Sequence, residues 1–140
     1  MKKVLVLCTG NSCRSQIAHG WLNYYSGSTA QIYSAGIETH GVNPKAIATM
    51  AAVGVDISHH TSNLVEEYSA IDFDYILTVC DHAAENCPVI PSKNAVRLHQ
   101  NFSDPSKLEG TPAQIETAFA ETRDTIAAYC KDFVKNNLGQ

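Results

Sequence analysis

The sequence predicts an α/β domain built as a three-layer sandwich, with helices on both faces of a central four-stranded parallel sheet. Two observations carry this prediction. Short apolar runs that end in turn residues alternate with longer segments in which apolar residues recur at helical spacing. The length of 140 residues suits one domain, and neither repeats nor a linker divides the sequence, so we assign residues 1–140 to a single domain.

The first strand and the first helix have the clearest signals. Residues 3–8 form a short apolar run before the turn residues 9–12, as expected of a buried parallel strand. A helix is predicted from Ser15 until Gly27, because the apolar residues of this segment share one face. These residues are Ile17, Ala18, Trp21, Leu22 and Tyr25.

The later elements continue the alternation. Strands are predicted at residues 31–34, 73–79 and 95–98, and helices at residues 44–53, 62–68 and from Thr111 until Gly139. Asn43 and Ser62 are the expected N-caps of the first two of these helices, and residues 80–87 are expected to form a mixed loop or short helix. Cys8 and Cys80 each end a predicted strand. Ligands gather at the carboxyl ends of parallel strands, so both thiols are expected at one edge of the sheet.

The composition narrows the classes of function. A net charge of −4 without a Lys/Arg cluster argues against nucleic-acid binding. No apolar run approaches the roughly 18 residues of a membrane span, and residues 4–7 are too short for a secretory signal, which needs about 7–15. We therefore expect a cytoplasmic protein, with a monomer as the default state. The cysteines number five, which argues against a disulfide framework and leaves packing residues, metal ligands or reactive thiols.

The strongest local signal is an anion-binding loop at residues 8–15, between the first strand and the first helix. Gly10 and Asn11 tolerate unusual backbone angles, so consecutive N–H groups can turn inward at the helix N-terminus and bind an anion. Arg14 adds a planar guanidinium that suits a tetrahedral oxyanion. The predicted oxyanion-binding residues are Thr9, Gly10, Asn11, Ser12, Cys13 and Arg14.

Cys8 is predicted to act as a thiolate nucleophile in this loop. A free thiol has a pKa of about 8.5, which a helix N-terminus and a nearby cation lower. Ser15 can add a hydrogen bond from its hydroxyl to the sulfur. The alternative is a buried strand-end cysteine beside a solvated arginine. The position between strand and helix, with Gly, Asn and Ser inside the loop, favours the nucleophile.

Asp104 is the candidate general acid. A displacement at phosphorus or arsenic needs its leaving oxygen protonated, and Asp104-Pro105 precedes the last predicted helix. An Asp-Pro pair is by itself more often a turn. Its combination with the loop at residues 8–15 makes it a catalytic candidate.

Together these motifs resemble the thioredoxin-coupled arsenate reductases, which share the low-molecular-weight tyrosine phosphatase fold. The loop alone does not separate a reductase from a phosphatase, whereas the pair Cys80 and Cys87 favours the reductase. The resemblance covers most of the chain. It is carried by residues 8–16, 34–38, 40–44 and 60–62, Cys80, Cys87-Pro88 and Asp104-Pro105.

The resemblance implies a role for each thiol. Cys8 would attack arsenate, which Arg14 and the loop amides hold, while Asp104 assists the leaving oxygen. Cys80 would then attack Cys8 and release arsenite, and Cys87 would attack Cys80. Thioredoxin would reduce the resulting disulfide between residues 80 and 87, although glutaredoxin with glutathione remains an alternative electron donor. Phosphate or sulfate would bind as analogues of arsenate.

The spacing of the implied redox pair adds a structural expectation. In one regular helix, residues 80 and 87 would have Cα atoms about 10 Å apart along the axis. A disulfide needs roughly 4.4–6.8 Å. The segment is therefore expected either to be irregular or to change shape on oxidation.

Two departures from the related families bear on cofactor and substrate. The reductases often have a potassium site with oxygen ligands near Asn11 and Ser34, but His19 and Asn63 stand where acidic partners would be expected. This substitution argues against a potassium effect, and no cofactor is expected to be required. The phosphatases commonly carry aromatic residues after the Asp-Pro pair. Here Ser106-Lys107 follows, which favours a small inorganic substrate.

Other interpretations remain open at the level of sequence. The first is a small protein-tyrosine phosphatase, which needs no second thiol, and another is a non-catalytic sensor of oxyanions or oxidation. Cys13 is not expected to be catalytic, Cys130 is expected to pack in the last helix, and His59-His60 is expected to form a polar turn. A zinc site is a further alternative, with the ligands Cys80, His82, Cys87 and His99.

Overall fold

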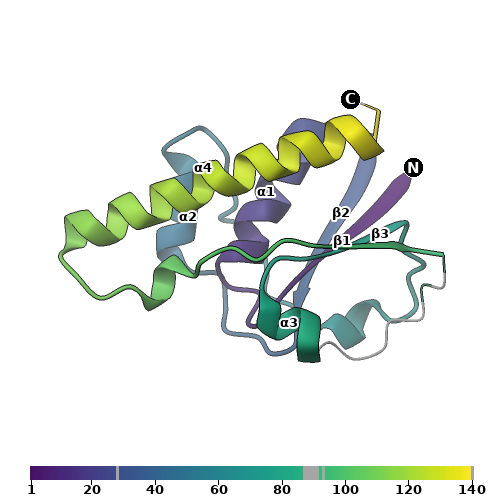
Figure 1. Ribbon diagram of the computed structural model, residues 1–140, viewed down its shortest axis with the longest axis horizontal. Helices are drawn as coiled ribbons and strands as arrows, with labels where there is room; N and C mark the ends of the chain where they lie inside the picture. The colour runs from purple at the N-terminus through teal and green to yellow at the C-terminus, as the bar shows by residue number, and fades with distance from the viewer. Residues whose placement is uncertain (28, 87–91, 93, 140) are drawn as a thin grey trace.

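The computed structural model describes residues 1–27, 29–86, 92 and 94–139. Its sheet is parallel throughout, with the strand order β2-β1-β3-β4, and helices flank it (Figure 1), which confirms the predicted fold class. The strands are β1 (Lys2–Cys8), β2 (Ala30–Gly36), β3 (Tyr75–Thr78) and β4 (Val96–His99). The α-helices are α1 (Arg14–Ser26), α2 (Pro44–Ala51), α3 (Asp81–Asn86) and α4 (Pro112–Asn137). Short 3-10 helices are η1 (Val65–Tyr68) and η2 (Pro105–Lys107).

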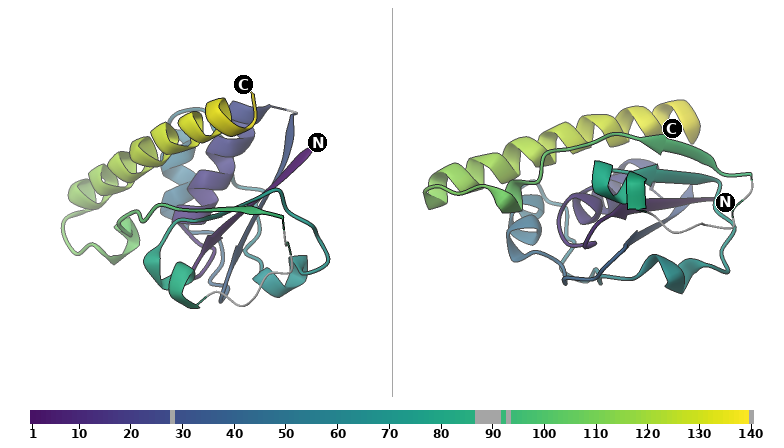
Figure 2. Two further views of the ribbon diagram at one scale, coloured as in Figure 1. Left: turned by 45° about the vertical axis from the view of Figure 1, so that its right-hand side comes forward. Right: turned by 60° about the horizontal axis from the view of Figure 1, so that its bottom comes forward.

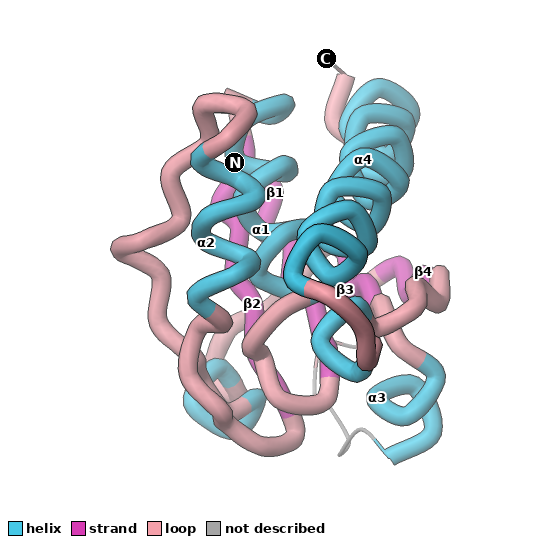
Figure 3. The backbone as a smooth tube through the Cα atoms, turned by 90° about the vertical axis from the view of Figure 1, so that its left-hand side faces the viewer, coloured by secondary structure: helices cyan, strands magenta, loops and turns pink. Residues whose placement is uncertain are grey.

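Strand β1 separates two hydrophobic clusters. Val4 and Val6 belong to the larger cluster, under α1, α2 and α4, whereas Leu5 and Leu7 belong to a smaller cluster on the opposite face. All four side chains are at most 1% exposed. Burial on both faces explains why this strand is a continuous apolar run rather than an alternating one. Figure 3 shows α1 between α2 and α4, above the sheet.

The topology brings Cys8 and Cys80 to the same edge of the sheet. Strands β1 and β3 are parallel neighbours, and Leu7 pairs with Thr78 near their carboxyl ends. The chain then continues into the loop before α1 on one strand and into α3 on the other. In the left view of Figure 2 both chain ends lie at the top, whereas the teal helix α3 lies at the bottom. The prediction that both thiols share one edge is therefore confirmed.

Several predicted boundaries differ from the structure. Helix α2 ends at Ala51 rather than at residue 53, because Gly54 adopts a left-handed conformation and closes the helix. Ser62 caps no helix: its Oγ donates instead to the carbonyl of Gly10, at 3.0 Å. The helix expected at residues 62–68 is consequently reduced to η1.

Helix α3 agrees with the short helix expected after Cys80, while Cys87, Pro88 and Pro91 lie outside the described residues. The helix predicted from Ser15 begins one residue earlier, at Arg14. Within the described parts of the chain, no helix is both long and apolar enough to cross a membrane.

Candidate active site

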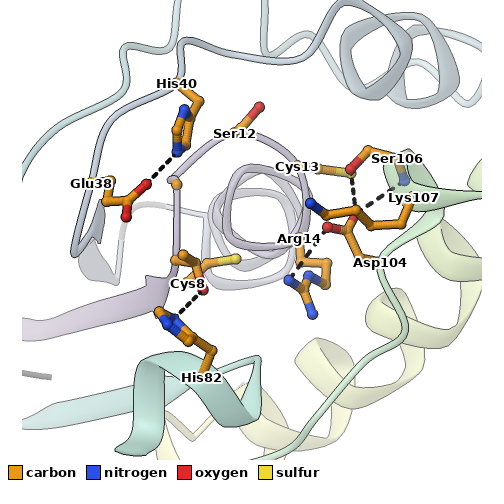
Figure 4. A pocket seen from close by; sticks show the side chains of 12 residues that line it. Cys8, Ser12, Cys13, Arg14, Glu38, His40, His82, Asp104, Ser106 and Lys107 are labelled. Carbon is orange, nitrogen blue, oxygen red and sulfur yellow. Dashed lines mark hydrogen bonds and ion pairs between the residues drawn. The ribbon is translucent and has the colours of Figure 1, made fainter. Parts of the chain in front are cut away.

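A cavity of about 520 Å³ opens where the carboxyl end of β1 meets the start of α1 and the loop before α4. Figure 4 shows Cys8, Arg14 and Asp104 around it. The structure thus brings together three residues that sequence reasoning placed in one site from distant segments. The lining residues are Cys8, Thr9, Gly10, Ser12, Cys13, Arg14, Glu38, His40, His82, Asp104, Ser106 and Lys107.

The N-terminus of α1 points its first N–H groups toward this cavity. Its N-cap residue, Cys13, makes no side-chain capping hydrogen bond. The first helical hydrogen bond runs from the N–H of Ile17 to the carbonyl of Cys13, at 2.9 Å. The preceding N–H groups carry partial positive charge and suit an anionic ligand.

Arg14 is positioned by two groups from the segment before α4. Its Nη1 donates to the carbonyl of Phe102 at 2.8 Å, and its Nη2 lies 3.6 Å from Asp104 Oδ2. Its Nε is buried and has no hydrogen-bond partner among the residues that the structure describes. An unpaired buried guanidinium N–H costs free energy, and a bound oxyanion would supply the missing acceptor.

Asn11 fastens the loop from inside. Its side-chain Nδ2 donates to Ser15 Oγ at 2.9 Å, and its Oδ1 accepts from the Asn63 N–H at 2.8 Å. Its carbonyl accepts from Gln16 Nε2 at 3.0 Å. Asn11 has a φ of 46°, which asparagine tolerates better than most residues. The hydroxyl of Ser15 accepts from Asn11, while the Ser15 N–H is the group that bonds to the Cys8 sulfur. The expected hydrogen bond from the Ser15 hydroxyl to that sulfur stays a prediction.

Gly10 is required for a different reason from the one predicted. It does not have a positive φ. A Cβ at this position would instead lie 2.3 Å from Cδ2 of His40, so a side chain would displace the His40 ring from the loop. Residues 38–43 brace the loop from this side, since the N–H groups of Glu38 and Asn43 donate to the carbonyls of Thr9 and Ser12, each at 2.9 Å.

Cys8 and Cys80 form a hydrogen-bonded pair of sulfur atoms. The bond to Cys8 is the largest cause that lowers the pKa of Cys80, to about 5, and Thr9 and Arg14 add to it. The same bond, with burial, raises the pKa of Cys8 and outweighs Arg14 and the Ser15 N–H. The two thiols therefore titrate together, and contact with Cys8, Thr9 and Arg14 favours a thiolate at Cys80. The Cys8 thiolate stays a prediction, and the loop sequence contains no sign of this second thiol.

Asp104 caps η2 at the edge of the cavity. Its Oδ1 accepts from the N–H and the hydroxyl of Ser106, at 3.0 and 2.6 Å, while its Oδ2 faces Arg14. The side chain is 19% exposed, so it remains accessible from the cavity. This position fits a group that protonates a leaving oxygen at the site.

The other cysteines have different surroundings. Cys13 is 5% exposed, and burial, with the charge of Asp104, raises its pKa to about 12. Cys130 is fully buried in the core beneath α4, as expected of a packing residue, and burial raises its pKa as well. Neither is suited to act as a nucleophile. Cys87, the third member of the implied redox series, lies outside the described residues.

Two imidazoles, tilted by 30° to each other, pack together beside Ser34 and Gln16, on the side of the loop where the resemblance suggested a potassium site. The rings of His19 and His60 lie 4.2 Å apart. His19 Nδ1 is 2.8 Å from Ser34 Oγ, and His60 Nδ1 is 2.9 Å from Gln16 Oε1. Burial lowers the pKa of His19 to about 3 and that of His60 to about 4. Neutral rings already bonded to these oxygens do not fit a hard cation.

The turn predicted at His59-His60 is present, since the His60 N–H donates to the carbonyl of Ile57 at 3.0 Å, and the His60 ring also packs against His19 of α1. His99, one of the ligands in the zinc alternative, has other partners for both ring nitrogens. Its Nδ1 lies 2.6 Å from Thr78 Oγ1, and its Nε2 lies 2.6 Å from Asp81 Oδ1. Among the described residues, no three His, Cys, Asp or Glu side chains form a metal-binding group.

Sequence reasoning missed several residues at the cavity. The Glu38–His40 pair, joined at 2.7 Å, and Lys107 line its mouth. His82 had been considered only as a zinc ligand, yet its Nδ1 lies 3.0 Å from Thr9 Oγ1. The one sequence signal for His82 was its position two residues after Cys80.

The fold and the site together fit the class of enzymes that place a cysteine and an arginine at an anion-binding loop after a parallel strand. The chain belongs to the low molecular weight phosphotyrosine protein phosphatase family, whose model matches residues 3–139.

Its relatives narrow the comparison within this family. The chain is 46% identical over 134 residues to an arsenate reductase of Halalkalibacterium halodurans, with 96% of each chain covered. It is 42% identical over 134 residues to an arsenate reductase of Bacillus subtilis, again with 96% coverage of both. A solved arsenate reductase in its oxidized state matches with a TM-score of 0.83 and 28% identity, over 97% of this chain and 98% of that one. The resemblance inferred from the motifs is confirmed.

Proposed function

We propose that this protein reduces arsenate to arsenite. The observation that carries the proposal is a second thiol beside the loop that holds Cys8: Cys80 Sγ lies 3.4 Å from Oγ1 of Thr9, the residue after Cys8. Hydrolysis of a phosphate ester needs one thiol, whereas reduction of arsenate needs two electrons, which two thiols supply when they form a disulfide. The names of the close relatives support the same substrate.

The first step joins Cys8 to arsenic. The loop N–H groups and Arg14 hold the three non-reacting oxygens, and Cys8 Sγ attacks arsenic opposite the fourth. The hydroxyl of arsenate leaves as water with a proton from Asp104, and the proton released by the Cys8 thiol returns to the Asp104 carboxylate, so one proton is transferred overall. One S–As bond forms and one As–O bond breaks, while arsenic remains pentavalent.

The second step transfers the electrons. The Cys80 thiolate attacks Cys8 Sγ, an S–S bond forms, and the electron pair of the S–As bond stays on arsenic. Arsenic is thereby reduced from the pentavalent to the trivalent state and leaves as arsenite. The lowered pKa of Cys80 suits this order, since its contacts with Cys8, Thr9 and Arg14 favour the thiolate that attacks.

The enzyme is then restored by thiol–disulfide exchange. Cys87 attacks Cys80 and frees Cys8, and thioredoxin reduces the disulfide between residues 80 and 87. We propose that the reaction takes place in the cytoplasm, in a monomer, and without a resident cofactor or potassium.

Replacing the second thiol tests this function. Turnover is measured as NADPH consumption that depends on arsenate, with thioredoxin and its reductase, and in parallel with glutathione and glutaredoxin. Cys80→Ser should reduce turnover at least a thousandfold, since the electrons have no second source. Cys130→Ser, a buried thiol far from the site, is the matched control. Arsenate turnover that persists in Cys80→Ser would reject the two-thiol scheme.

A phosphatase is the second candidate, favoured by the complete set of Cys8, Arg14 and Asp104 at the cavity and by the family that the chain belongs to. The same Cys80→Ser protein separates the two functions. If hydrolysis of an aryl phosphate is the main activity, it should persist without the second thiol and disappear in Cys8→Ser.

A further inference from the structure

Thr9 connects the attacking thiol to a histidine. Thr9 Oγ1 lies 3.4 Å from Cys80 Sγ and 3.0 Å from His82 Nδ1. Thr9 follows Cys8 at the end of β1, and His82 lies in the first turn of α3. The Thr9 hydroxyl therefore joins the end of β1 to two residues at the start of α3, which lie 71 and 73 positions further along the chain.

The number of protons decides the direction of these two hydrogen bonds. A threonine hydroxyl has one proton to donate and two lone pairs to accept. Arsenate reduction requires Cys80 as a thiolate, which can only accept. The Thr9 proton therefore points to the sulfur, and a lone pair of Thr9 faces His82, so the Nδ1 atom of His82 must carry the proton of the second bond.

The following inference rests on the proposed function. We propose that His82 is a positioning residue, whose Nδ1–H donates to Thr9 Oγ1. This bond keeps the Thr9 hydroxyl proton directed at the Cys80 thiolate that attacks Cys8. Without the histidine, the Thr9 hydroxyl is free to rotate toward the cavity or toward solvent. The thiolate then loses one of the hydrogen bonds that stabilise it.

Other charged groups near Cys80 act by different routes. Arg14 lowers the pKa of Cys80 through its charge, from the side of α1. Asp81 faces away toward β4, where its carboxylate contacts His99 at 2.6 Å. On the far side of the cavity, Glu38 is paired with His40, and Asp104 with Arg14. Among these described groups, His82 is the one in contact with the Thr9 hydroxyl.

The test measures the reactivity of Cys80 directly, so it does not depend on arsenate turnover. Alkylation of Cys80 by iodoacetamide is followed across pH by mass spectrometry of the labelled peptide, in a Cys8→Ser background that removes the competing thiol. His82→Ala should shift the midpoint of the pH profile upward and slow alkylation about fivefold near neutral pH, the effect of one lost hydrogen bond of typical strength.

Two conservative variants distinguish the effect of the His82 hydrogen bond from the effect of side-chain size. The amide of His82→Asn reaches the place of Nδ1 and should keep the rate within twofold, whereas His82→Gln extends to the place of Nε2 and should behave like His82→Ala. In a Thr9→Val background, where no hydroxyl exists, His82→Ala should have no further effect. Equal rates in all His82 variants, or an undiminished effect without Thr9, would overturn the proposal.

The design separates failure of this inference from failure of the proposed function. If alkylation changes in His82→Ala but the unmodified protein does not reduce arsenate, the positioning role of His82 is supported and the reductase function is rejected. Normal arsenate turnover combined with unchanged alkylation would reject the positioning role alone.

Discussion

Asn11 fastens the oxyanion-binding loop through both its side chain and its backbone. It takes part in three hydrogen bonds, with Ser15, Gln16 and the N–H of Asn63, and it is completely buried. Its left-handed conformation directs the neighbouring N–H groups inward. Stability and oxyanion binding should therefore depend on the same side chain.

Asn11→Ala should lower the free energy of unfolding by about 2–4 kcal/mol, from two lost side-chain hydrogen bonds and an unfavourable φ for alanine. Urea unfolding measures this loss, and phosphate binding followed by calorimetry should weaken in parallel. Asn23→Ala, at an exposed position of α1, is the matched control and should change stability by less than about 0.5 kcal/mol. Two variants of equal stability would contradict the central role of Asn11.

Single residues also show which features of the site can be predicted from neighbours along the chain. Cys8, Asn11 and Arg14 were predicted because their chemistry follows from neighbours within a few positions. The charge on Cys8 was not predictable in this way, because it depends on Cys80, whose distance along the chain says nothing about contact. His82 was missed as a site residue for the same reason, since its partner Thr9 lies in the loop after β1, 73 residues away.

At the scale of elements, α3 is attached to the sheet at its first residue. Asp81 Oδ1 lies 2.6 Å from His99 Nε2, and the Asp81 N–H donates to Asn101 Oδ1 at 3.0 Å. The helix covers residues 81–86 and makes few buried contacts, with Ala83 as its buried residue. A short element held mainly by exposed polar contacts can unfold locally at low cost.

Oxidation should loosen α3. Residues 80 and 87 must approach within roughly 4.4–6.8 Å between Cα atoms to form a disulfide, which a continuing helix would prevent. Amide hydrogen exchange of residues 81–86 should therefore become faster in the oxidised protein. Cys80→Ser under the same oxidising conditions is the control and should keep the exchange rates of the reduced form. Equal protection of α3 in the reduced and oxidised protein would count against the scheme.

Elements were predicted well where one local pattern sufficed. The apolar run of β1 and the start of α4 at Thr111-Pro112 appear as expected, the latter with a capping box between Thr111 and Gln114. Helix 62–68 was overpredicted, because the Ser62 hydroxyl bonds to Gly10 rather than capping a helix. That choice depends on a loop 52 residues away.

At the scale of the whole molecule, the stack of His19 and His60 joins α1 to β2 and to the segment before η1. Both rings have pKa values below the ordinary 6.5, with burial as the main cause. The folded protein therefore binds fewer protons than the unfolded chain whenever the pH falls below about 6.5. Stability from these groups is complete above that pH and is lost as the pH decreases toward the folded-state values.

Burial of His19 in its neutral form should lower the free energy of unfolding by about 2 kcal/mol between pH 7 and pH 5. The reason is that His19 binds a proton in the unfolded chain at pH 5 but not in the folded protein. Urea unfolding at both pH values measures the slope, which His19→Gln should flatten. His59→Gln, at a side chain that is 70% exposed, should retain the slope of the unmodified protein. Identical slopes in all three proteins would show that His19 is not buried in a neutral form.

The spacing of apolar residues and the Cys-x5-Arg-Ser loop were sufficient to predict the alternation of strands and helices and the turn that places Cys8 and Arg14 together, because these features arise from neighbours along the chain. Contacts between distant segments decided the rest: that Cys80 lies beside the loop, that His82 meets Thr9, and that the rings of His19 and His60 pack together. Burial and pairing change pKa values only after the chain has folded, so no local pattern contains them.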